Sequence, residues 1–103
     1  MNYTVMQHRK AILKQLKSSP SLSYEEIMEA INEYQIASAH NIAVGKFKGI
    51  IDYIKEGKSV MIANTGIENI VINSKQQLID LIKSSDYYNT ISNSNFFETC
   101  FNE

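Results

Sequence analysis

The sequence predicts a small protein of the α+β class that folds as a single domain. Helical periodicity and short runs of strand-forming residues both occur in the 103-residue chain, and no repeat or linker divides it. Apolar residues make up 44% of the chain, which is ordinary for a globular domain and sufficient for one core. The expected order is helix, helix, short strand, helix, β-hairpin and helix. The first two helices fall in residues 1–35 and the remaining elements in residues 36–84.

The first expected helix occupies most of residues 1–20. Val5, Ile12 and Leu16 recur at helical spacing, and basic residues occupy much of the remaining surface. Pro20 ends this helix, because proline disfavours helical backbone in the residue before it. No acidic residue precedes Glu25, so we expect a strongly basic helix.

The second expected helix begins at a capping box, in which Ser23 is followed three residues later by Glu26. In such a box each side chain satisfies a backbone N–H that the helix itself leaves unpaired. Beyond the box, the helix has one apolar face and one acidic face. The apolar face contains Ile27, Ala30, Ile31 and Tyr34, and the acidic face contains Glu25, Glu29 and Glu33.

Residues 35–42 fit a short extended segment or a loop, and a strongly periodic helix follows over residues 43–56. Gly57 stands where a left-handed residue commonly ends a helix. Gly45 and Gly49 lie one turn apart and each lowers helix stability by up to ~1 kcal/mol relative to alanine. Two interpretations account for them: another backbone packs closely there, which we favour, or a ligand approaches the helix.

Two short β runs, residues 59–63 and 69–73, flank a glycine-containing connection and predict a β-hairpin. Ser74 and Gln77 then form a second capping box that opens the last regular helix, which continues to Ile82.

Residues 85–103 differ from the rest of the chain. They are rich in Ser, Asn and Thr, contain no basic residue, and show no sustained period. Such a polar segment with many aromatic side chains either folds back onto the domain or binds a protein partner. If this tail binds a partner, the contacts are expected from Tyr87, Tyr88, Phe96, Phe97 and Phe101.

Composition and charge exclude several functional classes. The formal net charge of −1 argues against a uniformly basic nucleic-acid binder and against an acidic solvating tail. No apolar run approaches the ~20 residues that span a membrane, and the chain does not begin with a signal-peptide core. We therefore expect a soluble, cytoplasmic protein.

Residues that commonly carry catalysis are few, so we expect no enzyme, no metal site and no cofactor. The sequence contains no phosphate-binding glycine loop, nucleophile motif or metal-spaced cluster. Cys100 is the single cysteine, which excludes an internal disulfide, and it lacks a neighbouring cation that would activate its thiol. Asp52 is expected to pair with Lys48, four residues earlier on the same helix.

The small net charge hides a segregated distribution. The formal charges of residues 1–20, 21–35, 36–84 and 85–103 are +4, −4, +2 and −3. Basic and polar residues near the start of the third helix and around the hairpin can bind phosphates and base edges. The candidate DNA-binding residues are Ser38, His40, Asn41, Lys46 and Lys48, with Lys58, Asn64 and Thr65 as backbone contacts.

A pattern of apolar and glycine positions covers about half of the chain. It comprises Ala43, Phe47, Ile50, Ile51, Ile54, Gly57, Val60, Ile62, Gly66, Val71, Ile72, Ser74 and Leu78. With this pattern, residues 36–84 resemble the DNA-binding module of the Phd/YefM antitoxin family. The resemblance implies a homodimer whose helices and first strand present basic residues to operator DNA. It also implies a C-terminal segment that neutralises a toxin, a role that the tail would fill.

A second pattern covers residues 9–31 and includes Ile12, Leu13, Leu16, Glu25, Glu26, Ile27 and Ala30. It is similar to the first two helices of winged-helix regulators, in which a short strand, here Ser21–Ser23, precedes the second helix. This resemblance implies that residues 43–56 form the recognition helix and residues 58–73 the wing. Both resemblances place the DNA surface at the start of the third helix together with the hairpin.

Two hypotheses of function follow from the sequence. The first is a small DNA-binding transcriptional regulator, an antitoxin-like autorepressor that acts as a homodimer. The alternative is a non-enzymatic protein-binding module, such as an inhibitor, immunity or adaptor protein encoded by a phage or mobile element. The acidic helix face and the aromatic tail support the alternative, because aromatic residues are common in interface cores.

Overall fold

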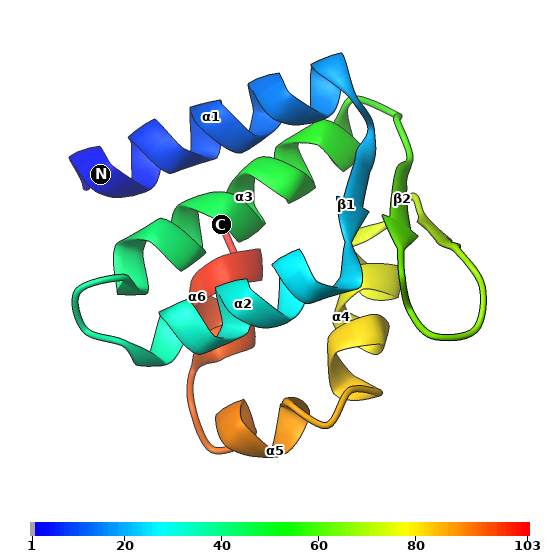
Figure 1. Ribbon diagram of the computed structural model, residues 1–103. Helices are drawn as coiled ribbons and strands as arrows, with labels where there is room; N and C mark the ends of the chain where they lie inside the picture. The colour runs from blue at the N-terminus through cyan, green and yellow to red at the C-terminus, as the bar shows by residue number, and fades with distance from the viewer. Residues whose placement is uncertain (1) are drawn as a thin grey trace.

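A computed structural model describes residues 2–103 and confirms the α+β class, with six helices and a three-stranded sheet in that range. Figure 1 shows the helices grouped on one side of the sheet, with the hairpin loop projecting at one end. The elements in chain order are α1 (Tyr3–Ser18), β1 (Ser21–Ser23), α2 (Tyr24–Gln35), α3 (His40–Lys55), β2 (Val60–Ala63), β3 (Ile70–Ile72), α4 (Lys75–Lys83), α5 (Tyr88–Ile91) and α6 (Phe96–Phe101).

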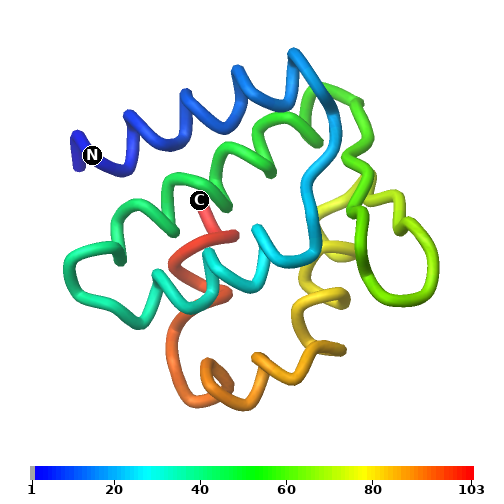
Figure 2. Tube along the Cα trace, viewed as in Figure 1, coloured from blue at the N-terminus to red at the C-terminus, as the bar shows by residue number. Residues whose placement is uncertain are grey.

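Helices α1 and α3 lie side by side and run in the same direction (Figure 2). Helix α2, which lies between them in the chain, runs in the opposite direction. Gly45 and Gly49 of α3 face the backbone of α1. A Cβ atom at Gly45 would lie 2.6 Å from the carbonyl oxygen of Val5, and one at Gly49 would lie 2.5 Å from that of Arg9. These distances confirm the interpretation that both glycines allow close backbone packing.

The three strands form one mixed sheet in the order β1-β2-β3. β1 pairs with β2 in parallel, with Leu22 opposite Ile62, and β2 pairs with β3 antiparallel. Alternation along the strands turns Leu22 and Ile62 into the core. Met61 and its cross-strand partner Val71 face outward and are 39% and 56% exposed.

The predicted helix starts at Ser23 and Ser74 are confirmed, but within residues 2–103 only the serine half of each capping box forms, and the Gln77 side chain accepts from the N–H of Asn73 instead. Ser23 accepts a hydrogen bond from the backbone N–H of Glu26 at 3.0 Å, and Ser74 accepts one from that of Gln77 at 3.2 Å. Gly57 follows α3 with a φ of +83°, in the left-handed region.

One expected element is absent from its predicted place. The sequence predicts an extended segment or loop at residues 35–42, and the structure shows a turn at 36–39 with no strand. Helix α2 continues to Gln35 and α3 begins at His40, so the four residues between them turn the chain, and the N–H of Ala39 donates to the carbonyl oxygen of Ile36 at 3.0 Å. The strand outside the hairpin is instead β1 at Ser21–Ser23, where the winged-helix resemblance places a strand.

Residues 85–103 fold back onto the domain, which was one of the two alternatives for this segment. Phe96 is fully buried and meets the ring of Tyr34 edge-on at 4.9 Å and that of Phe47 at 5.2 Å. Tyr34 also donates a hydrogen bond to the side chain of Asn95 at 2.7 Å. The C-terminal segment therefore completes the core, with Ile91, Phe96, Cys100 and Phe101 as its buried residues.

The Gly49→Ala variant tests the close contact of α1 and α3. An added methyl group would lie 2.0 Å from the Cγ2 atom of Ile12 and 2.5 Å from the backbone carbonyl oxygen of Arg9, which cannot rotate away, so the helices must separate. We expect the free energy of unfolding to fall by about 1–3 kcal/mol, despite the ~1 kcal/mol that alanine gains in helix propensity. The control is Asn32→Ala at an exposed position of α2, which should change stability by less than about 0.5 kcal/mol. Urea unfolding of a Gly49→Ala variant at wild-type stability would show that the helices do not touch there.

Candidate functional site

Helix α3, the recognition helix of the winged-helix resemblance, is the central helix of the domain. Within His40–Lys55, only Lys55 is exposed. A helix that reads DNA must offer a face to the groove, and α3 is instead covered by α1, α2 and α6. Its buried residues are Ala43, Val44, Gly45, Phe47, Gly49, Ile50, Ile51, Tyr53 and Ile54.

Lys46 and Lys48 do not act on one surface. Two residues apart on a helix, they point to nearly opposite sides. Lys46 lies 2.7 Å from a carboxylate oxygen of Glu33 on α2, and Lys48 lies 3.3 Å from one of Glu103. Each lysine is therefore paired within the chain, on a different side of α3.

The other predicted residues at the start of α3 join it to α2. The Nδ1 atom of His40 lies 2.8 Å from the carbonyl oxygen of Tyr34, and the two rings are 4.4 Å apart. Ser38 is exposed in the turn, and Asn41 is half-buried. His40 thus holds the α2–α3 connection in place.

The predicted hairpin contacts lie elsewhere. Asn64 adopts a left-handed conformation with a φ of 62°, and the hydroxyl of Thr65 donates to the carbonyl of Glu68. The ammonium group of Lys58 lies 5.5 Å from the ring centre of Tyr53. Figure 1 shows the hairpin loop at the opposite end of the molecule from the start of α3. The expectation that the helix start and the hairpin form one surface is therefore wrong.

The aromatic residues predicted to bind a partner are mostly engaged inside the domain. Phe96 and Phe101 are buried, so neither is available to a partner in this fold. Tyr87, Tyr88 and Phe97 are half-buried, and Phe97 stacks on Phe101 with ring centres 6.1 Å apart. Aromatic content alone could not distinguish a core segment from a binding segment.

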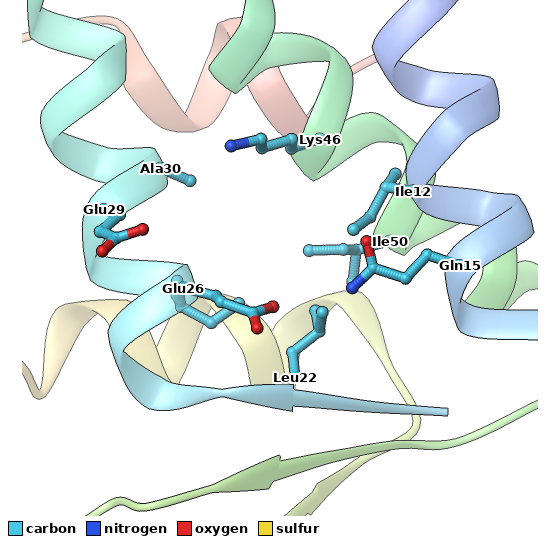
Figure 3. Close-up of a pocket in the computed structure, with 9 residues that line it drawn as sticks. Ile12, Gln15, Leu22, Glu26, Glu29, Ala30, Lys46 and Ile50 are labelled. Atoms are coloured by element: carbon cyan, nitrogen blue, oxygen red, sulfur yellow. The ribbon is translucent and has the colours of Figure 1, made fainter. Parts of the chain in front are cut away.

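A groove of about 210 Å³ lies between α1, α2 and α3. Figure 3 shows α2 on one side, α1 on the other and α3 behind, with Leu22 of β1 at one end. The floor is apolar, and polar side chains stand at the rim. The floor residues are Ile12, Leu22, Ile27, Ala30 and Ile50, and the rim residues are Gln15, Glu26, Glu29 and Lys46.

The α2 side of the groove is acidic. Glu26, Glu29 and Glu33 recur at spacings of three and four residues, so they share one side of the helix. Glu33 pairs with Lys46, whereas Glu26 and Glu29 form no ion pair within residues 2–103. Glu25, which the sequence grouped with this face, does not line the groove.

A network of charged side chains lies elsewhere on the α1–α3 pair. The Arg9 guanidinium lies 2.5 Å from Asp52 and 2.6 Å from Glu103. The prediction that Asp52 pairs with Lys48 is wrong. Because α1 packs closely on α3, Arg9 pairs with Asp52, and Lys48 pairs with Glu103. Hydrogen bonds from Arg9 lower the pKa of Glu103 to about 2.

The cysteine and the candidate metal-binding side chains form no reactive or metal-binding cluster within residues 2–103. Burial raises the pKa of the Cys100 thiol to about 12, so this thiol is protonated at neutral pH. Within residues 2–103, no group of three or more metal-binding side chains converges. Among the helices of the same range, none has the length and apolar character needed to cross a bilayer.

Comparison of the chain with models of protein families, with curated proteins and with solved structures gave no significant match.

The Glu103→Gln variant tests the charged network. Because the folded-state pKa of Glu103 lies below its ordinary value of 4.5, its ion pairs stabilise the fold above that pH. This stability is lost as the pH falls from 4.5 toward about 2. Since the side chain is 37% exposed, solvent screening limits the effect to below about 1 kcal/mol.

Thermal unfolding at several pH values measures this effect. We expect Glu103→Gln to unfold at a lower temperature than wild type at neutral pH and at nearly the same temperature near pH 2. The control is Glu98→Gln, since Glu98 is exposed and forms no ion pair within residues 2–103. Equal effects of the two substitutions at neutral pH would argue against the network.

Proposed function

We propose that this domain is a non-enzymatic protein-binding module whose groove takes a basic, amphipathic helix. The observation that carries the proposal is the combination of an apolar floor with the unpaired carboxylates of Glu26 and Glu29 at its edge. Amphipathic helices dock in this way, with apolar anchors in the groove and charged residues along its rim.

The groove has the size for one apolar anchor. Its volume of about 210 Å³ exceeds the ~150 Å³ of an engineered cavity that holds benzene. A leucine or phenylalanine side chain would thus fit, and its burial stabilises a complex by about 1.5–3 kcal/mol.

The acidic wall determines the sign of the partner's charge. Lysine or arginine residues that flank the anchor would lie near Glu26 and Glu29, whereas acidic residues would be repelled. Lys46 does not cancel this preference, because its ammonium group is held by Glu33 at 2.7 Å. Carboxylates, one amide and one ammonium group line the groove, which supports recognition rather than nucleophilic chemistry.

Binding of a labelled helical peptide of lysine and leucine tests the proposal by fluorescence anisotropy. We expect wild-type protein to bind it and Glu29→Lys to bind about tenfold or more weakly, because attraction becomes repulsion. Glu25→Lys makes the same charge change outside the groove and should retain most of the affinity.

A glutamate–leucine peptide of equal length serves as the ligand control and should not bind. Equal weakening by Glu29→Lys and Glu25→Lys would show that only the overall charge matters, and the groove proposal would fail.

DNA binding by a dimeric regulator is the second candidate, and the exposed face of α1 supports it. Lys10 and Lys14 are exposed, form no ion pair within residues 2–103, and lie one turn apart. No acidic side chain occurs on α1, so the helix could follow a phosphate backbone.

Titration of the protein with duplex DNA at several salt concentrations tests the second candidate. A Lys10→Ala/Lys14→Ala variant should bind more weakly, and the salt dependence should fall by about one unit per lost phosphate contact. Lys46→Ala should bind like wild type, because Lys46 is paired in the groove. Absence of binding at low salt would eliminate this candidate.

A further inference from the structure

We infer that a second copy of this chain is the partner whose basic helix packs against the acidic wall of the groove, so that two copies form a symmetric dimer. In this dimer α1 of each copy lies along the acidic α2 wall of the other. The inference rests on the proposed function, because it uses the same groove and names its occupant.

Helix α1 has the charge that the acidic wall selects, while its apolar residues Val5, Ile12 and Leu16 are buried in its own domain. All four of its formally charged side chains are basic, namely those of Arg9, Lys10, Lys14 and Lys17. Arg9 is held by Asp52 and Glu103, and Lys17 lies 3.5 Å from Glu56. Lys10 and Lys14 therefore remain for a contact outside the chain.

The positions of the two helices make the surface self-complementary. Gln15 of α1 and Glu26 of α2 line the same groove, so α1 and α2 flank it at the same level. A two-fold axis along the groove places α1 of one copy over α2 of the other. Lys10 and Lys14 then come to the level of Glu26 and Glu29 in the second copy.

Charge distinguishes this arrangement from the other symmetric one. A two-fold axis across the groove would place α1 on α1 and α2 on α2, which sets lysines against lysines and glutamates against glutamates. Like charges at an interface disfavour such a dimer. The methylene stems of Lys10 and Lys14 can also cover the apolar floor while their ammonium groups reach the carboxylates.

The dimer closes on itself. Each copy provides one basic helix and one acidic wall, and the two-fold axis satisfies both at once. A basic helix from another protein would have to displace α1 of the second copy, so self-association would compete with the binding of any other partner.

Sedimentation equilibrium of the full chain measures the association. We expect wild-type protein to dimerise at low ionic strength and to dissociate at high ionic strength, because exposed charges are screened by salt. Lys14→Glu and Glu29→Lys should each weaken dimerisation by about tenfold or more, since each contact occurs twice in the dimer.

Variants that restore opposite charges at positions 14 and 29 of the two copies provide the most direct test of the dimer. The double variant Lys14→Glu/Glu29→Lys should dimerise again, and so should an equimolar mixture of the two single variants, because opposite charges face each other once more. The controls are Lys58→Glu and Glu25→Lys, which make the same charge changes away from the groove and should dimerise like wild type.

Three results would overturn the inference: a wild-type monomer at low ionic strength, single variants that dimerise like wild type, or a double variant that stays monomeric. If the protein is a monomer that still binds the lysine–leucine peptide, the dimer inference fails and the proposed function stands. A protein that neither dimerises nor binds the peptide would remove the proposed function as well.

Discussion

The close contact between the backbones of α1 and α3 determines where the other elements lie. Gly45 and Gly49 bring α3 so near to α1 that a single added methyl group meets backbone carbonyl oxygens within 2.6 Å. Two parallel helices cannot be joined by a short turn, so the chain crosses back through β1 and α2 before α3 begins. That return path places α2 along the same pair of helices, and the groove is the space left between α1 and α2.

The same contact sorts the charges of the chain. It brings Arg9 to Asp52, and the C-terminal Glu103 accepts from both Arg9 and Lys48. Arg9, Lys48, Asp52 and Glu103 are therefore all paired within the chain. The carboxylates of Glu26 and Glu29 stay unpaired within residues 2–103, as do two lysines of α1. A net charge of −1 therefore conceals two exposed surfaces of opposite sign.

The parts of the fold that depend on neighbouring residues could be predicted from the sequence. The N-cap serines Ser23 and Ser74, the glycine that follows α3 and the packing role of Gly45 and Gly49 follow from local chemistry, and the structure confirms them. The parallel pairing of β1 with β2 joins residues forty positions apart, and no local pattern encodes it. The groove depends on three helices at once, so its floor residues read in the sequence only as ordinary core positions. The ion pairs of Lys46 with Glu33 and of Lys48 with Glu103 also join separate elements, so local sequence patterns do not predict them.

Amide NMR spectra of the full chain, recorded while the lysine–leucine peptide is added, test most directly whether the groove is the binding surface. A bound helix changes the environment of the groove residues, so the largest shift changes should fall on Leu22, Ala30 and Ile50. Shift changes centred on the loop at residues 64–69, or the absence of any change, would contradict the account. In that case, the unpaired carboxylates of α2 would be ordinary solvated side chains.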